Sequence, residues 1–189
     1  MMPRDIDLQL LEKTMTPHLT IRQAELHDAD AIARFNSAMA LETEGKVLLP
    51  ERVNPGVLRL LNDPSLGFYV VAEQAGEVVG CLMITNEWSD WRNGLFWWIQ
   101  SVYIVPAARR QGVYRALYDH VRDMARANPG ICGFRLYVEK ENAAAQRTYG
   151  SLGMAPTDYL VYEEMKAGER YFAQSPAGSA RTGNGPRLR

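Results

Sequence analysis

Along the first half of the chain, apolar residues recur in some segments at the spacing of a strand and in others at the spacing of a helix. These segments predict the strands and helices there. Residues 19–22 alternate as a short strand, and 68–73 and 77–84 form two longer apolar runs joined by a short turn. One helix is expected after a cap at 27–30 and another after Pro55, because apolar residues recur there at helical spacing. The first half therefore predicts antiparallel strands with helices beside them.

The second half of the chain repeats the order strand, helix, strand. Residues 95–105 are apolar on both alternating faces, which is typical of a central strand that is covered on both sides. A helix with an apolar stripe begins at Gly112, and a strand at 134–138 follows it. A further helix begins at Asn142, and a last strand is expected at 159–165. This order predicts one α/β domain, with a single mixed and mostly antiparallel central sheet, flanking helices and one parallel β-α-β crossover.

The two ends of the chain lack this periodicity. Residues 1–16 are expected to form a loose N-terminal arm or a short helix, and 17–168 the folded domain. Residues 169–189 are rich in small and polar residues without an apolar repeat, which predicts a disordered tail.

Composition and charge exclude several classes of function. The chain has 189 residues, 47% of them hydrophobic, and a net charge of −1, so no overall field attracts nucleic acid or an anionic membrane. We see no apolar run long enough to cross a bilayer and no signal-peptide pattern. Cys81 and Cys132 lie far apart, which indicates neither a metal site nor a disulfide framework and fits a reducing cytoplasm.

The segment from Pro106 to Tyr114 has the order of parts of an anion site. A strand ends at the proline, a basic turn follows, and a helix begins at Gly112. The N–H groups of such a turn lack intrahelical partners, and the helix dipole adds partial positive charge. Arg109 and Arg110 add charge suited to phosphate oxygens, and a glycine allows close approach of a ligand. An ordinary turn with two solvated arginines explains the same residues about as well.

Two motifs in a fixed order connect this chain with a known family. The first is Arg109-Arg110-Gln111-Gly112-Val113-Tyr114, and the second is residues 142–154, with the pattern N-x-x-A-x-x-x-Y followed by a leucine-glycine helix end. The first resembles the pyrophosphate loop R/Q-x-x-G-x-G/A of the GNAT superfamily of acyl-CoA-dependent N-acetyltransferases, and the second resembles a later segment of the same family. The resemblance spans about residues 19–165. Tyr114 departs from it, so its phenol is expected to turn away from the cofactor or lie along it.

The resemblance implies that acetyl-CoA is the co-substrate. The loop amides of residues 110–114 would bind its pyrophosphate, with Arg109 beside them. The backbone of Val102, Tyr103 and Ile104 would pair with the pantetheine amides where a β-bulge splays this strand from the next. Asn142 would contact the pantetheine, with capping of its helix as the main role.

The resemblance also implies direct attack of an amine on the thioester. Tyr149 would be the general acid that protonates the departing thiolate, since a phenol is protonated near neutral pH. Core packing explains the same tyrosine, because it lies on an apolar helical stripe. Glu139 is the first candidate for the base, Glu44 and Asp90 are others, and deprotonation through water stays open.

The acceptor side is expected to include Glu44, Trp98, Gln100 and Tyr137. Aromatic rings near Glu87 could form a cage for a cationic amine, although core or dimer packing explains the tryptophans as well. The expected acceptor is a small cationic amine such as a polyamine, an amino acid or an aminoglycoside, with a protein N-terminus or lysine as the other class.

Two classes of function therefore remain. The first is an N-acetyltransferase that uses acetyl-CoA and an amine, binds no metal, nucleic acid or membrane, and forms monomers or homodimers. The second is a non-catalytic acyl-CoA-binding or sensing module with the same fold. Nucleotide-binding P-loop and Rossmann proteins are excluded, since the sequence has neither GxxxxGK[ST] nor GxGxxG.

Overall fold

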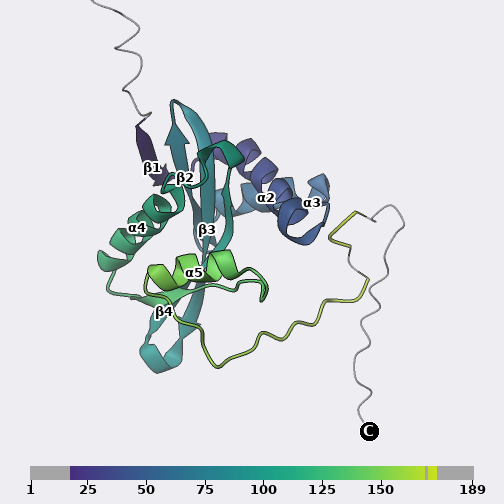
Figure 1. The fold of residues 1–189 in the computed structure, drawn as a ribbon. Coiled ribbons are helices and arrows are strands. Elements are labelled where there is room, and N and C mark those ends of the chain that lie inside the picture. The colour runs from purple at the N-terminus through teal and green to yellow at the C-terminus, as the bar shows by residue number, and fades with distance from the viewer. Residues whose placement is uncertain (1–17, 169, 174–189) are drawn as a thin grey trace, which may run out of the picture.

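The computed structural model describes residues 18–168 and 170–173 (Figure 1). The strands among them form one mixed five-stranded sheet. Its strands lie in the order β1-β2-β3-β4-β5, with antiparallel pairs from β1 to β4 and a parallel pair of β4 with β5. The fold class expected from the sequence is therefore confirmed. The strands are β1 (Leu19–Gln23), β2 (Gly67–Gln74), β3 (Glu77–Ser89), β4 (Gly94–Ile104) and β5 (Ile131–Arg135).

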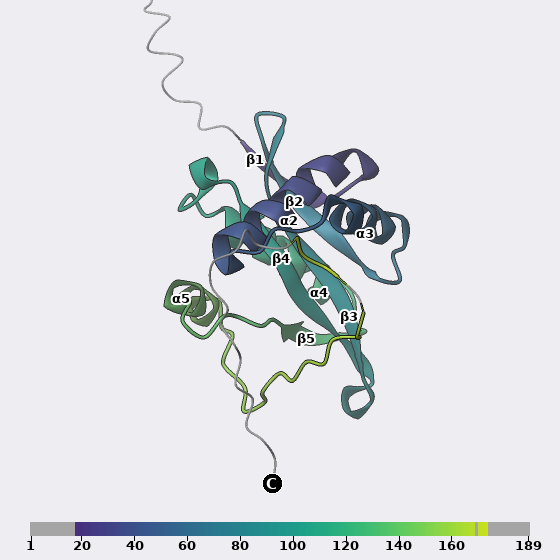
Figure 2. The same cartoon turned by 90° about the vertical axis from the view of Figure 1, so that its right-hand side faces the viewer.

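Helices cover both faces of this sheet (Figure 2). Helices α2 and α3 pack on one face of the sheet and α4 packs on the other. Helix α5 follows β5 along the chain. The bounds are α2 (Ala29–Glu44), α3 (Pro50–Asn62), α4 (Val113–Arg126) and α5 (Ala143–Ser151), with short 3-10 turns η1 (Leu26–Asp28), η2 (Asp90–Arg92) and η3 (Pro106–Ala108).

The two helical layers follow from the alternation of side chains along the buried strands. Val70 of β2 points toward α4, where it belongs to one buried cluster with Leu117 and Val121. Its neighbour Val71 points to the opposite face and packs in a second cluster with Ile32 of α2. Because both faces are covered, the middle of β2, residues 69–72, is apolar and buried throughout.

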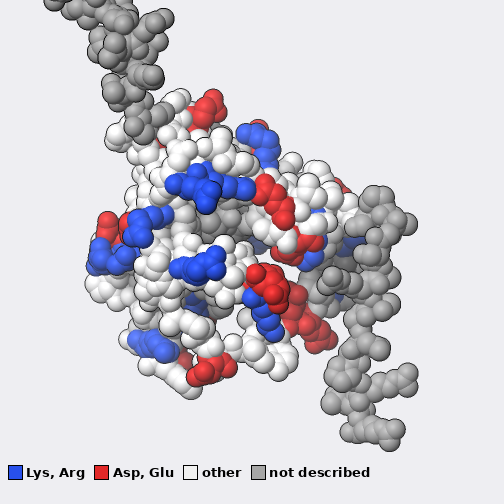
Figure 3. Space-filling view, in the orientation of Figure 1, with Lys and Arg blue, Asp and Glu red and all other residues white. Residues whose placement is uncertain are grey.

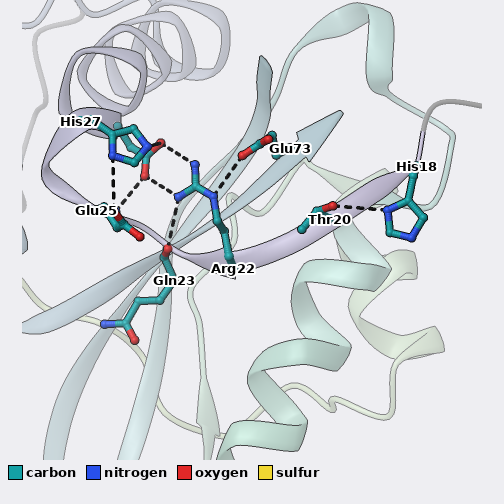
Figure 4. Close-up of polar contacts among 8 residues, drawn as sticks. His18, Thr20, Arg22, Gln23, Glu25, His27 and Glu73 are labelled. Carbon is teal, nitrogen blue, oxygen red and sulfur yellow. Dashed lines mark hydrogen bonds and ion pairs between the residues drawn. The ribbon is translucent and has the colours of Figure 1, made fainter. Parts of the chain in front are cut away.

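A buried ion pair joins β1 to the start of α2 (Figure 4). Arg22 donates from Nη1 and Nη2 to the two carboxylate oxygens of Asp28, at 2.7 and 2.9 Å, and from Nε to Glu73 on β2 at 3.1 Å. The backbone N–H of Glu25 adds a third bond to Asp28 at 2.8 Å. Asp28 is only 2% exposed, so this network fixes the entry of α2 onto the sheet.

Three predicted element bounds were wrong. The second helix begins at Pro50, where the missing N–H of a proline costs nothing, and it carries Pro55 inside. Strand β5 occupies Ile131–Arg135 rather than 134–138, because it starts to pair with β4 directly after the preceding turn. Residues 159–165 form no strand, and Tyr159 is 80% exposed. The alternating pattern of these residues favours a strand, but in the described part of the chain no other strand pairs with them.

Candidate active site

Strands β4 and β5 pair over a short distance, and we call the unpaired edge of β4 beyond residue 98, on the side of β5, the slot. Their ladder runs from Leu95↔Ile131 to Trp98↔Arg135. From residue 99 to Ile104, β4 continues with no pairing to β5 among the described residues. The backbone groups on that edge, apart from the Ile104 carbonyl, are therefore available to hydrogen-bond a ligand.

A bulge redirects β4 at the slot. Between the pairs that flank Leu82 of β3, residues 101 and 102 of β4 stand opposite this single residue. Ser101 has φ +48°, which L-residues seldom adopt, and its carbonyl accepts a hydrogen bond from the thiol of Cys81 at 3.7 Å. The bulge implied by the family resemblance is present, and it lies beyond Trp98, the last residue of β4 that pairs with β5.

The loop that follows β4 presents a row of unpaired backbone donors. In the described residues, none of the N–H groups of residues 110–115 donates a hydrogen bond, and the next donor, Ala116, bonds to the Gly112 carbonyl at 3.0 Å. Arg110 and Gly112 have positive φ angles of +66° and +80°. No atom lies within 4 Å of the position that a Cβ would take at Gly112. Helix α4 has no acidic residue in its first turn, so this end suits an anion.

Arg109 is turned back toward the protein. Its Nε donates to the Ile104 carbonyl at 2.8 Å and its Nη2 to Glu42 of α2 at 2.7 Å. The Tyr103 hydroxyl donates to the other oxygen of Glu42 at 2.9 Å. These two donors, Arg109 first, hold the pKa of Glu42 below its ordinary value. On the face seen in Figure 3, basic side chains lie beside acidic ones and do not form one continuous basic patch.

Two tyrosines meet between α4 and α5. The ring of Tyr149 lies 5.8 Å from that of Tyr114, at 67°, and Tyr114 stacks on Tyr118 at 6.2 Å. The Tyr114 phenol therefore turns away from the loop and into the core, where its hydroxyl has no partner among the described residues. Burial raises the pKa of both Tyr149 and Tyr114, which keeps the two phenols protonated.

The structure brings together three of the four residues expected on the acceptor side. Tyr137 donates from its hydroxyl to Gln100 Oε1 at 3.2 Å, and its ring lies 5.9 Å from that of Trp98. Gln100 in turn donates to the hydroxyl of Thr85 at 2.6 Å. Because Thr85 is in register with Trp98, these side chains share the sheet face that carries α2 and α3. We call these four residues the polar wall.

Glu87 lies beside the polar wall. Its carboxylate accepts hydrogen bonds from the indole Nε1 of Trp98 and from Arg135. The guanidinium of Arg135 also stacks over the Phe96 ring at 4.0 Å. The sequence placed Glu87 near the tryptophans, but it gave no sign of the pairing with Arg135, which lies 48 residues away.

The four tryptophans divide between different environments. Trp97 is 6% exposed and belongs to the core under α4, whereas Trp98 faces the polar wall. Trp88 and Trp91 lie on the exposed β3–β4 hairpin. Asp90, in the same hairpin, accepts from the Trp91 backbone at 2.8 Å.

The two carboxylates expected to act at the site make no hydrogen bond or ion pair with the polar wall in the described structure. Glu44 ends α2 and pairs with Lys46 in solvent. Glu139 lies in the turn before α5, where its carboxylate accepts the Glu141 N–H at 2.7 Å. The strand expected at 134–138 would have placed Glu139 on the same face as Tyr137, but β5 ends at Arg135, so the two residues share no strand face.

Asn142 caps α5, as its position predicts. Its Oδ1 accepts the backbone N–H of Ala145 at 3.0 Å. Gln111, in the loop, is held in a similar local way, since its side chain donates to the Ala107 carbonyl at 2.8 Å. Within residues 18–168 and 170–173, no group of three metal-binding side chains occurs, and no helix is long and apolar enough to cross a membrane.

Comparison with known proteins connects this geometry with one family. Residues 28–154 match the model of the Acetyltransferase (GNAT) family. The crystal structure of a possible acetyltransferase from Clostridium difficile 630 is 45% identical, with a TM-score of 0.74, covering 78% of this chain and 97% of that one. A search of the curated proteins finds no match.

Two more distant structures share the fold. A ribosomal-protein-alanine N-acetyltransferase from Brucella melitensis biovar Abortus 2308 is 18% identical, with a TM-score of 0.64, over 79% of this chain and 99% of that one. The aminoglycoside N-acetyltransferase AAC(6')-Iy in complex with CoA is 14% identical, with a TM-score of 0.65, over 81% and 98%. At these identities the likeness concerns the fold alone.

Proposed function

Because this chain belongs to the acetyltransferase (GNAT) family, we propose that it transfers an acetyl group from acetyl-CoA to a primary amine. The observation that carries this proposal is the junction of the slot with the row of unpaired N–H groups. A pyrophosphate needs several donors and a helix N-terminus, and a pantetheine arm needs an unpaired strand edge. Both lie at the carboxyl end of β4.

The cofactor set follows from this junction. The amides of residues 110–115 bind the pyrophosphate, and Gly112 leaves room for it. The unpaired backbone edge around Val102, Tyr103 and Ile104 receives the pantetheine amides. Asn142, which caps α5, contacts the pantetheine in this proposal.

The proposed chemistry is direct transfer. The nitrogen of the acceptor attacks the thioester carbonyl carbon, a C–N bond forms and the C–S bond breaks. The departing thiolate takes the hydroxyl proton of Tyr149, and the resulting phenolate takes up the proton that the nitrogen loses as the amide forms. The raised pKa of Tyr149 supports this role, since the phenol is protonated throughout the neutral range. The ammonium form of the acceptor must first lose a proton, for which we propose Glu139, directly or through water.

We propose a small cationic amine as the acceptor. The polar wall offers two aromatic rings and the amide of Gln100, with the carboxylate of Glu87 beside them. Aromatic faces attract a cation, and the amide orients an N–H donor. Glu44, at the end of α2, would add charge at the rim of this region.

The test is thiol release from acetyl-CoA over a panel of amines, with wild type and Tyr149→Phe. Loss of a positioned acid should lower kcat by roughly 10²- to 10⁴-fold. The Kd for acetyl-CoA, measured by calorimetry, should stay the same. Tyr159→Phe is the matched control, because this tyrosine is exposed and distant in sequence from every proposed residue of the cofactor set.

Each outcome decides between the classes of function. Full activity of Tyr149→Phe would remove Tyr149 as the acid. Tight binding of acetyl-CoA without turnover of any amine would favour a non-catalytic binding or sensing module. Absence of acetyl-CoA binding by the wild type would refute the whole proposal.

A further inference from the structure

Glu42 lies outside both sequence motifs, yet it joins the pyrophosphate loop to helix α2. Its two carboxylate oxygens accept hydrogen bonds from Arg109, 67 residues away, and from Tyr103, 61 residues away. We propose that Glu42 is a positioning residue for acyl-CoA binding, which acts by holding Arg109 and with it the loop amides. This inference rests on the proposed binding of acyl-CoA at that loop.

Arg109 has the contacts of a structural brace. Its Nε holds the carbonyl of Ile104, the last residue of β4, while Nη2 holds Glu42. The guanidinium also lies 5.4 Å from the centroid of the Tyr103 ring, so one face of it is covered. A side chain held by three contacts restricts its own backbone, and the pyrophosphate loop begins at the backbone of Arg109.

The loop needs such a brace because its backbone is strained. Arg110, the next residue, has φ +66°, a conformation that L-residues adopt only under restraint. Gly112 follows with φ +80°. Relaxation of residue 110 would turn its N–H away from its neighbours, so the row of donors would have to be ordered again when the ligand binds.

The charge of Glu42 makes the proposal decidable. A carboxylate near a pyrophosphate site repels the ligand, whereas a carboxylate that orders the donors helps to bind it. Removal of the charge therefore strengthens binding if repulsion dominates and weakens it if positioning dominates. Our proposal requires weaker binding.

The experiment compares Glu42→Gln with wild type in the full-length protein, with CoA as the titrated ligand in calorimetry. We expect Kd for CoA to rise about tenfold, equivalent to about 1.4 kcal/mol. The KM for acetyl-CoA should rise to the same extent, with unchanged kcat at saturation and unchanged KM for the amine. Glu51→Gln, an exposed glutamate in the first turn of α3, is the control and should leave all these constants unchanged.

A double-mutant cycle identifies the route. If Glu42 acts through Arg109, the variant Arg109→Met weakens CoA binding, and adding Glu42→Gln to it has little further effect. Additive losses would overturn the proposed route. Thermal unfolding of each variant completes the test, because a general loss of stability would also lower kcat and the affinity for the amine.

The failures are distinguishable. A wild type that does not bind CoA refutes the proposed function. A wild type that binds CoA, together with a Glu42→Gln variant of equal or higher affinity, overturns the positioning role and leaves the proposed function intact.

Discussion

At the scale of single residues, Tyr114 buries a hydroxyl without a hydrogen-bond partner in the described structure. Replacement by phenylalanine keeps the ring contacts with Tyr118 and Tyr149 and removes the cost of desolvating the hydroxyl. We expect Tyr114→Phe to raise the free energy of unfolding by about 1 kcal/mol in urea denaturation.

Tyr69 supplies the matched control for this prediction. Tyr69 is 3% exposed and its hydroxyl accepts a hydrogen bond from Asn36 Nδ2 at 3.2 Å, so Tyr69→Phe should lower the free energy of unfolding by about 1 kcal/mol. A loss of stability in Tyr114→Phe equal to that in Tyr69→Phe would contradict the prediction, since it would mean that the Tyr114 hydroxyl has a partner.

Motifs predict residues whose surroundings are local, and they miss partners that are distant in the sequence. Asn142 caps a helix that begins at the next residue, so its sequence position is enough to predict the cap. Trp98 and Gln100 share a face because they are two residues apart on one strand. The contact of Glu42 with Arg109 depends on how α2 lies on the sheet, which no local pattern encodes.

At the scale of elements, the pair of Arg22 and Asp28 couples β1 to α2, and its strength depends on pH. Burial raises the pKa of Asp28, but the hydrogen bonds from Arg22 and the Glu25 N–H lower it more, so the net pKa is below the ordinary value. A lowered carboxyl pKa stabilises the fold above the pKa of the unfolded chain, about 4, and this contribution is lost as pH falls through the folded pKa.

The corresponding variant is Asp28→Asn. It leaves the guanidinium of Arg22, with Glu73 as the remaining carboxylate, so the free energy of unfolding at pH 7 should fall by about 3 kcal/mol. Below pH 4, where wild type loses this contribution, the difference should shrink. Urea denaturation at several pH values measures it, and a difference that is independent of pH would contradict the assignment to Asp28.

Helices and strands could be predicted where their apolar pattern agrees with the elements that they pack against. The hairpin of β2 and β3 and the helix α4 have strong periodicity, and each packs where the pattern requires. Residues 159–165 have a strand pattern, but a strand forms only when another strand supplies its hydrogen bonds. The start of β5 was placed three residues too late because the sequence marks a turn but not the register with β4.

At the scale of the whole molecule, the two cysteines have opposite accessibility. Cys81 lies in the interior between β3 and α2, where burial raises the pKa of its thiol to about 12, and Cys132 is exposed on β5. A thiol reagent should therefore label one equivalent per native chain and two in guanidinium. Native Cys132→Ser should give none, whereas two fast equivalents in native wild type would contradict the burial of Cys81.

The overall arrangement was the most predictable level, because it depends on the order of many elements rather than on one contact. Strands, crossover and helical layers follow from periodicity, and the family motifs predict that the proposed cofactor site lies at the carboxyl end of β4. The polar wall needed three segments in register, and only the structure gives that register.

The slot also leaves one edge of the sheet open to an added partner. If a pantetheine arm bonds the free edge of β4, it serves as a removable strand, and the backbone amides it covers become slow to exchange with deuterium. A ligand present at a hundred times its Kd would stabilise the folded chain by about 2.7 kcal/mol. Resistance of this protein to proteolysis in the cell would then rise and fall with the supply of acyl-CoA.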